Sequence, residues 1–261
     1  MPTSQCALTS ELLTARGVRH GFSTRLGGVS EGEFSSLNVA VSPGDDPSSV
    51  TENLRRYAAA IDVDPARLYQ ISQVHGSSVR EVSAEDDRVA LLRELGDALI
   101  ARDPSIAIGV RVADCVPILM LDETSGHVAA VHAGWRGVVA DVIAVALVTL
   151  IRNAPRGPRA IVAAIGPCIG PCCFEVDDDV ARTIEGAAPG DAAVVRRDRP
   201  KPHVDLRRAV RLQLRALGVD DARIEDVEGC TRCDDRRFFS YRRDGARSGR
   251  HLASIAARSA S

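Results

Sequence analysis

Three residues whose side chains bind borderline metals stand in short motifs along the chain: His75 in QVHG, Cys115 in ADC and His132 in AVHAGWRG. Each is expected at the end of a strand that feeds into a loop, where α/β folds collect active-site groups. Two imidazoles and one thiolate suit Zn²⁺, and three protein ligands leave a fourth position open for water or substrate. A zinc bound there would lower the pKa of water toward neutrality and stabilise developing negative charge.

The spacing of this trio does not by itself establish a metal site. Residues 76–114 separate His75 from Cys115 and residues 116–131 separate Cys115 from His132, which matches no compact zinc signature. Cys115 could instead be a nucleophile, with His132 or His75 as its base. Both roles need a thiolate, so the sequence leaves them as alternatives.

A second group of thiols is the rival zinc candidate, and it includes a CxxC pair in GCTRC. A structural four-cysteine site needs two ligand pairs in knuckle-like turns, whereas CIGPCC holds two adjacent cysteines and a proline. We therefore favour buried free thiols that act as small apolar residues. The group consists of Cys168, Cys172, Cys173, Cys230 and Cys233.

The histidine count argues against a multicopper oxidase. The chain has six histidines and no His-x-His pair, whereas copper clusters consume many imidazoles. Met120, the only methionine beyond the start, stands in the middle of an expected strand and is a poor axial ligand.

Composition limits the classes of function. The formal net charge of −2 argues against a nucleic-acid partner bound by bulk electrostatics. Lys201 is the only lysine among 33 basic residues, so the presence of an arginine at one position is weak evidence for a functional site. The seven arginines of 232–250 are expected to form a solvated surface. The longest apolar stretch, 138–151, is too short to span a membrane. No secretory signal and an odd number of cysteines predict a cytoplasmic protein with reduced thiols.

Hydrophobic patterning predicts the elements that must position these residues. Helices are expected over 51–62, 137–152 and 204–219, the last between Asp205 as N-cap and Gly218 as stop. Strands are expected over 17–23, 69–76, 105–115, 116–122, 127–133 and 159–167, and 223–250 is expected to form a strand, a loop and a second strand. Neighbouring strands follow one another too closely for strict βαβ alternation, which predicts a single domain of α/β or mixed α+β class with a mixed sheet.

Seven motifs, taken together and in order, resemble one family. They are HGFSTRLGGVSEGEFSSLNVA, QVHG, GDALIA, ADCVPIL, AVHAGWRG, IGPCIGPCCFEV and FFSYRRDG, and they extend from about residue 18 to residue 250. They resemble the laccase-domain purine nucleoside phosphorylases, whose bacterial members are also called polyphenol oxidases or peptidoglycan editing factors. The resemblance implies a layered α/β/β/α domain related to the cytotoxic necrotizing factor catalytic domain. It also implies a catalytic zinc held by His75, Cys115 and His132.

The activities implied by this resemblance are phosphorolysis of purine nucleosides, including methylthioadenosine, and deamination of adenosine. The substrates would then be purine nucleosides and phosphate, with Arg25 and Asn38 as substrate contacts. The alternatives are a hydrolase that edits amino-acid linkages of peptidoglycan precursors, a polyphenol oxidase that uses copper, and a non-catalytic scaffold.

Two positions depart from the family pattern. Leu54 follows Asn53 where members commonly have an arginine, so a phosphate-binding role there would pass to Arg55 or be lost. Ala101 follows GDALI where members often have threonine.

Overall fold

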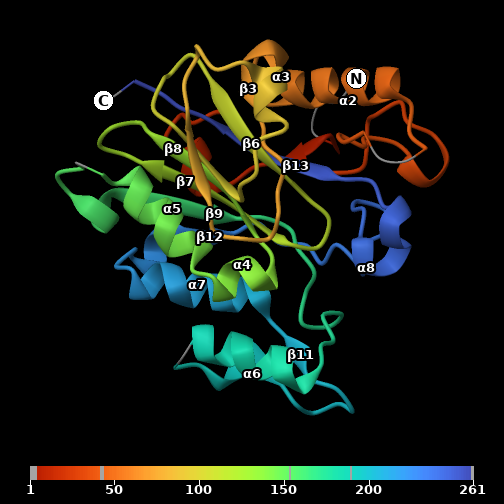
Figure 1. The fold of residues 1–261 in the computed structure, drawn as a ribbon, viewed down its shortest axis with the longest axis vertical. Coiled ribbons are helices and arrows are strands. Elements are labelled where there is room, and N and C mark those ends of the chain that lie inside the picture. Colours follow the sequence, from red (N-terminus) through yellow and green to blue (C-terminus); the bar gives the residue numbers. More distant parts are fainter. Residues whose placement is uncertain (1–4, 42–43, 153, 189, 260–261) are drawn as a thin grey trace.

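Two β-sheets lie face to face between two layers of helices (Figure 1). The computed structural model describes residues 5–41, 44–152, 154–188 and 190–259. The helix α2 (Pro47–Ala60) lies on one side of the paired sheets. The helices α4 (Trp135–Val139), α5 (Val142–Leu150), α6 (Asp178–Ala187) and α7 (Leu206–Ala216) lie on the other (Figure 1). This arrangement confirms the expected mixed α+β class and matches the layered architecture that the family resemblance implied.

The larger sheet has six strands in the order β12-β9-β7-β8-β5-β4. In chain order these strands are β4 (Val79–Val82), β5 (Ala98–Ala101), β7 (Val116–Asp122), β8 (Val128–Ala133), β9 (Ile161–Ile165) and β12 (Ile224–Asp226). The pairs β4–β5 and β9–β12 are parallel and the other pairs are antiparallel, so the sheet is mixed as predicted. The hairpin β7–β8 also confirms the two consecutive strands expected over 116–122 and 127–133.

The smaller sheet has five strands in the order β1-β2-β13-β6-β3. Its strands are β1 (Ala7–Leu8), β2 (His20–Ser23), β3 (Leu68–Tyr69), β6 (Ala107–Val112) and β13 (His251–Ala256). A separate two-stranded ribbon joins β10 (Val195–Arg196) to β11 (His203–Val204). The long pairing of β13 with β6 brings the end of the chain against its middle.

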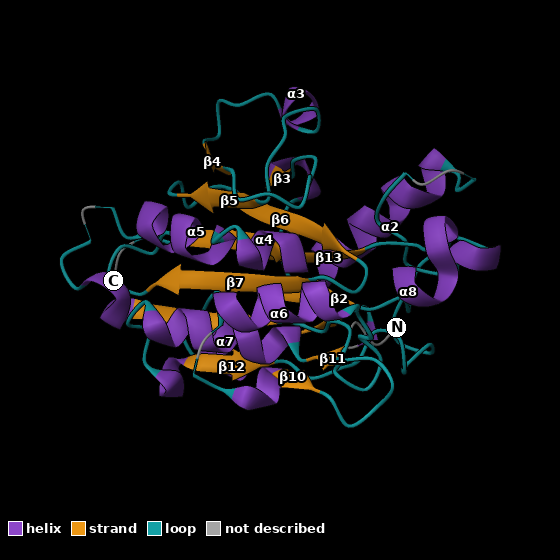
Figure 2. Ribbon diagram, turned by 60° about the horizontal axis from the view of Figure 1, so that its bottom comes forward, coloured by secondary structure: helices purple, strands orange, loops and turns teal. Residues whose placement is uncertain are grey.

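The described part of the chain forms eight α-helices. They are α1 (Glu11–Thr14), α2 (Pro47–Ala60), α3 (Arg88–Leu91), α4 (Trp135–Val139), α5 (Val142–Leu150), α6 (Asp178–Ala187), α7 (Leu206–Ala216) and α8 (Tyr241–Asp244). Figure 2 shows α4, α5, α6 and α7 in front of the six-stranded sheet, with α2 and α8 beyond one end of it. The helix α7 confirms its sequence signals, because the Asp205 carboxylate caps its N-terminus and Gly218 follows it with a φ of 92°.

Burial of three apolar layers accounts for the stacking. Leu119 and Ile108 belong to a layer between the two sheets. Ile118 lies in the layer between the larger sheet and α4–α7, while Tyr57 of α2 packs on the outer face of the smaller sheet. Consecutive residues such as Ile118 and Leu119 therefore face opposite layers, which is why β7 is buried along its whole length.

The helix expected over 51–62 begins earlier, at Pro47 after the N-cap Asp46, and three other predicted elements are also wrong in their extent. The helix expected over 137–152 is divided into α4 and α5 at Asp141, whose φ of 59° no α-helix accommodates. The strand expected over 69–76 ends at Tyr69, because the chain beyond it turns and donates its N–H groups to a side chain. The second strand expected within 223–250 begins only at His251, since Ser240 caps the short helix α8.

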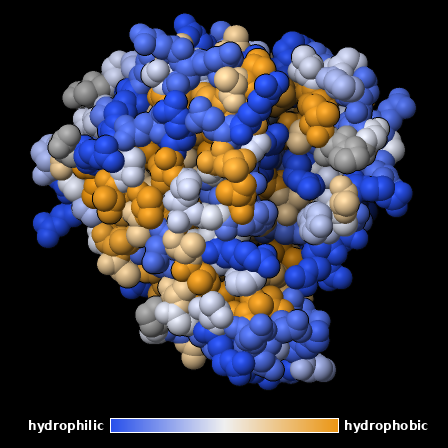
Figure 3. All heavy atoms as spheres, viewed as in Figure 1, coloured by the Kyte–Doolittle hydropathy of each residue, from blue (hydrophilic) through white to orange (hydrophobic). Residues whose placement is uncertain are grey.

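None of the helices among the described residues combines the length and the hydrophobicity that a membrane span requires. One face of the molecule, which includes α5, shows apolar residues in several groups among hydrophilic ones (Figure 3). Val145 and Val148 of α5 are among the exposed large apolar side chains.

Candidate metal centre and pocket

The fold brings together the three residues singled out in the sequence. His75 lies in the loop after β3, Cys115 lies between β6 and β7, and His132 lies near the end of β8. Their ligand atoms are all within 4.8 Å of one another. Cys115 Sγ is 3.8 Å from His75 Nε2, and the two imidazole rings stand edge to face with centroids 4.8 Å apart. One thiol and two imidazoles therefore converge on one point.

Gly134 leaves space for this convergence. A Cβ atom at this position would lie 2.8 Å from His75 Cδ2 and 3.1 Å from Cys115 Sγ. The glycine of HAGWRG therefore does more than form a corner between β8 and α4, because any side chain there would occupy the volume between the donors.

The carboxylate of Asp97 accepts hydrogen bonds from both histidines of the trio. Its carboxylate accepts a hydrogen bond from His132 Nδ1 at 2.8 Å, which leaves His132 Nε2 free to face the other donors. The same carboxylate accepts the backbone N–H groups of His75 at 2.9 Å and Gly76 at 2.6 Å. These bonds hold the loop in which His75 adopts a φ of 61°.

The electrostatics of the trio favour an ionised thiol. Burial would raise the pKa of the Cys115 thiol, but the imidazoles of His132 and His75 lower it to about 6. Burial would lower the pKa of His132, but Cys115 and Asp97 raise it to about 9. Both shifts stabilise a thiolate beside an imidazolium, a charge pair in which a divalent cation can replace the proton.

Asp114, next to Cys115, is held by the C-terminal loop. It has a φ of 85°, which is uncommon for a residue with a side chain. Its carboxylate accepts hydrogen bonds from Thr231 Oγ1 at 2.6 Å, from Ser240 Oγ at 3.0 Å and from the backbone N–H of Arg242 at 2.6 Å. The segment 231–242 therefore fixes the backbone that presents Cys115.

The trio opens into a pocket of about 640 Å³, within the range usual for sites that bind small molecules. Phe174 and Tyr241 add aromatic rings to its wall, and Arg111, Arg242 and Arg250 add positive charge. Among the described residues, no carboxylate lies within ion-pair distance of any of these three guanidinium groups. Burial, followed by the charge of Arg250, lowers the pKa of Arg111, so the two cations repel each other in the absence of an anion.

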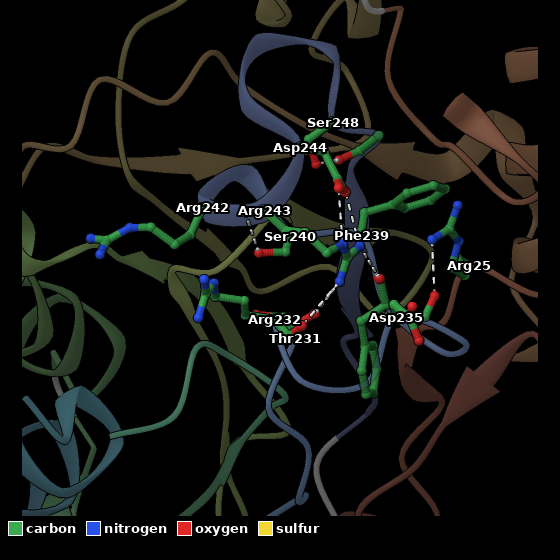
Figure 4. A network of polar contacts seen from close by, with 12 residues as sticks. Arg25, Thr231, Arg232, Asp235, Phe239, Ser240, Arg242, Arg243, Asp244 and Ser248 are labelled. Carbon is green, nitrogen blue, oxygen red and sulfur yellow. Dashed lines mark hydrogen bonds and ion pairs between the residues drawn. The ribbon is translucent and has the colours of Figure 1, made fainter. Parts of the chain in front are cut away.

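Arg25 and Asn38, expected as substrate contacts, lie outside this pocket. Arg25 donates to the backbone oxygens of Ser35 and Asp235 and stacks on Phe239 (Figure 4). Asn38 is fully buried, where its side chain bonds to Ala40 and accepts the N–H of Arg250 at 2.9 Å. Both side chains join loops: Asn38 contacts the backbone of Arg250, and Arg25 contacts the backbone of Asp235.

The two departures from the family pattern also have structural roles. Arg55 pairs with Glu52 on the exposed side of α2 and is not part of the pocket wall. Leu54 packs against the apolar layer beneath α2. Ala101 is fully buried between the two sheets.

The second group of thiols is assembled differently from the sequence interpretation. Four of its members have sulfur atoms within 4.8 Å of one another: Cys172, Cys173, Cys230 and Cys233. Cys172 and Cys233 are exposed, so the interpretation as buried free thiols is wrong for these two. Cys168 is buried and lies instead beside Arg207.

Several residues of the site were missed in the sequence. Asp97 is in GDALIA, Asp114 is in ADCVPIL, and Tyr241 and Arg242 are in FFSYRRDG, so each belongs to one of the seven motifs. Arg242 and Arg250 belong to the basic segment that was expected to be a solvated surface. Ion pairs do account for Arg237, Arg243 and Arg247. Which arginines of this segment face the pocket is set by the fold, and the sequence carries no signal for it.

Comparisons with known proteins agree with this geometry. Residues 19–258 match the family described as Multi-copper polyphenol oxidoreductase laccase. The chain is 37% identical over 250 residues to a protein of Geobacillus stearothermophilus named purine nucleoside phosphorylase YlmD, covering 93% of this chain and 91% of that one. It is also 37% identical, over 90% of this chain and 92% of the other, to adenosine deaminase RL5 from an unknown prokaryotic organism.

Solved structures show the same fold. The hypothetical protein YfiH of Bacillus licheniformis superposes with a TM-score of 0.89 at 29% identity, and 97% of each chain is covered. The family resemblance drawn from the seven motifs is thus confirmed by an independent match over nearly the whole chain. This protein belongs to the laccase-like polyphenol oxidoreductase family whose members include proteins named purine nucleoside phosphorylase.

Proposed function

We propose that this protein is a zinc-dependent purine nucleoside phosphorylase that also accepts methylthioadenosine and deaminates adenosine. The observation that carries the proposal is the pairing, in one pocket, of three convergent metal donors with arginines that lack carboxylate partners. The names of the relatives, purine nucleoside phosphorylase and adenosine deaminase, favour the same pair of reactions.

The donor set fits zinc. His75, Cys115 and His132 would hold the ion, in the arrangement of three protein ligands and one open position that catalytic zinc prefers. A bound zinc would supply Lewis acidity, which lowers the pKa of coordinated water and stabilises developing negative charge. The convergence of two imidazoles on one thiol also favours ligation over a nucleophilic role for Cys115, because a nucleophile needs only one base.

For phosphorolysis, the arginines supply the anion site. Arg111, Arg242 and Arg250 would bind phosphate so that one of its oxygens attacks the sugar carbon C1′ while the bond from C1′ to the purine nitrogen breaks. The electron pair of that bond leaves with the purine, which takes up a proton. Tyr241 and Phe174 offer aromatic faces against which the base can stack.

Deamination would use the same pocket without phosphate. Water adds to the purine carbon that carries the amine, and ammonia leaves after that nitrogen gains a proton. Asp97 holds His132 in one orientation during both reactions, so its role is to position a donor.

The positions of the other histidines favour zinc over a copper cluster. His20 bonds to the Ser10 and Val18 backbone, and His251 bonds to the Phe239 backbone. His127 contacts Arg102, and His203 contacts Arg199. Only two of the six imidazoles therefore lie at the pocket, whereas a multicopper centre needs many more.

We also propose that the chain is one domain. The pocket wall is built from segments as far apart as Ala40, His132 and Arg250. If the chain were divided into two domains between any of these residues, the pocket wall would be shared between the domains.

The test is turnover of a nucleoside panel by zinc-loaded protein, with and without phosphate. We expect inosine plus phosphate to give hypoxanthine and ribose 1-phosphate, adenosine to give inosine without phosphate, and His132→Ala to lose both reactions. Cys6→Ser, which changes a thiol outside the pocket, is the matched control. Activity equal in wild type and His132→Ala would overturn the proposal, and cleavage of a muramyl-peptide amide in place of nucleosides would favour a peptidoglycan-precursor hydrolase.

A further inference from the structure

Four thiols gather beside segments that line the pocket. Two come from the turn that follows β9, at Cys172 and Cys173, and two come from the CxxC pair Cys230 and Cys233. Cys172 Sγ lies 3.6 Å from Cys230 Sγ and 3.5 Å from Cys233 Sγ, and Cys173 Sγ lies 3.2 Å from Cys233 Sγ. Segments nearly sixty residues apart in sequence thus present four sulfur atoms to one another.

The separations suit one metal ion. A tetrahedral zinc with Zn–S bonds of about 2.3 Å places its sulfur ligands about 3.8 Å apart. The observed separations, all within 4.8 Å, require little movement to reach that arrangement. A cluster with several irons would need thiolates further apart, since its four thiolates bind to different irons.

The backbone around Cys230 has the form of a zinc knuckle. Gly170 donates its N–H to Cys230 Sγ at 3.2 Å, and the N–H groups of Arg232 and Cys233 also point to this sulfur. In such a turn the N–H groups two and three residues after the first cysteine stabilise its thiolate. Gly170 also leaves room for the sulfurs, because a Cβ there would lie 3.3 Å from Cys172 Sγ.

Positive charge surrounds the group. Arg232 contacts the Cys173 thiol, and Arg199 donates to the backbone oxygen of Cys172 at 3.2 Å. Four thiolates around one divalent cation carry a net charge of about −2, which these two guanidinium groups offset in part.

We propose that Cys172, Cys173, Cys230 and Cys233 form a second, structural metal site that takes one zinc ion. This site fastens together the two segments that form one wall of the pocket. The first segment contributes Ile169 and Phe174 to the wall, and the second contributes Tyr241 and Arg242. Both also reach the backbone beside Cys115: Ile169 donates its N–H to the Asp114 carbonyl, and the Asp114 carboxylate accepts the bonds from 231–242 described above.

The experiment measures metal content and ligand type in the full chain. Zinc per chain is determined by mass spectrometry of the metal in protein purified under reducing conditions, for wild type, Cys233→Ser and Cys115→Ser. We expect Cys233→Ser to hold one ion fewer than wild type and Cys115→Ser also to hold one ion fewer, because each change removes a different site. Cys168→Ser and Cys6→Ser, at thiols outside both sites, are expected to keep the wild-type content.

Cobalt replacement in the wild-type protein tests the ligands without any substitution. A tetrathiolate site gives stronger visible bands and stronger thiolate-to-cobalt charge transfer than a site with one thiolate. Both signals should therefore stay strong in Cys115→Ser and fall in Cys233→Ser to the level of the site that contains Cys115. Equal metal content in wild type and Cys233→Ser would overturn the proposal. So would mapping of disulfides among these four residues in the freshly purified wild-type protein. These readouts do not depend on nucleoside turnover, so failure of the proposed enzyme activity would be seen separately.

Discussion

Asp97 accepts the Nδ1 hydrogen of His132 at 2.8 Å and, through the same carboxylate, the backbone N–H groups of His75 and Gly76. One buried side chain therefore sets the orientation of one donor and the loop conformation of another. Such carboxylate–histidine contacts fix the tautomer of a ligating imidazole and raise its basicity.

Replacement of Asp97 by asparagine should weaken metal binding by about 10–100-fold, because the amide is a poorer acceptor and one of its ends is a donor. Competition with a chromogenic chelator measures the zinc dissociation constant. Asp45→Asn, at a carboxylate outside the pocket, is the control and should keep the wild-type affinity. An unchanged affinity in Asp97→Asn would show that this bond does not act on the metal site.

Gly134→Ala should disturb the donors without straining the backbone. The glycine has a φ of −70°, which alanine adopts readily, so the effect would come from the contacts of the new Cβ with His75 and Cys115. We expect zinc affinity to fall by at least about tenfold, comparable to the loss of a supporting contact. Gly186→Ala is the control, because a Cβ there meets nothing within 4 Å and should leave affinity unchanged. Equal affinities in the two variants would contradict the steric role of Gly134.

These two residues also show how far the sequence could predict the site. His75, Cys115 and His132 were identified because their residue types and motifs are informative without coordinates. Asp97 was not identified, because an aspartate after a glycine is as typical of a turn as of a functional site until its hydrogen-bond partners are known. The split of 137–152 was hidden for a similar reason: the apolar run continues across Asp141, and only its positive φ reveals the break.

Substitution of a pocket arginine should affect phosphorolysis more than deamination. Arg250→Gln removes a cation with no carboxylate partner among the described residues, and we expect the KM for phosphate to rise by about 10–100-fold, as for loss of a hydrogen bond to a charged group. Adenosine deamination, which uses no phosphate, should change much less. Arg55→Gln, at the exposed pair with Glu52, serves as control and should alter neither reaction. A parallel loss of both activities in Arg250→Gln would mean that Arg250 acts through the structure of the pocket.

The pH dependence of stability should reflect His251. This imidazole is buried between the Phe238 and Phe239 rings and accepts the Phe239 N–H at 2.8 Å. Burial lowers its pKa from 6.5 to about 3, so the native state keeps it neutral where the unfolded chain binds a proton. Stability from this group is therefore full above pH 6.5 and is lost as the pH falls toward 3, by about 1.4 kcal/mol per unit.

His251→Gln, which keeps an acceptor but cannot titrate, should remove this part of the acid sensitivity. Urea unfolding of metal-free wild type and variant at pH 7.5 and at pH 5.5 measures the difference between their losses of unfolding free energy. We expect the wild type to lose about 1.4 kcal/mol more than the variant between these pH values, since only its unfolded state gains the imidazolium. Equal losses would show that His251 titrates alike in both states, in conflict with its burial among the two phenylalanine rings.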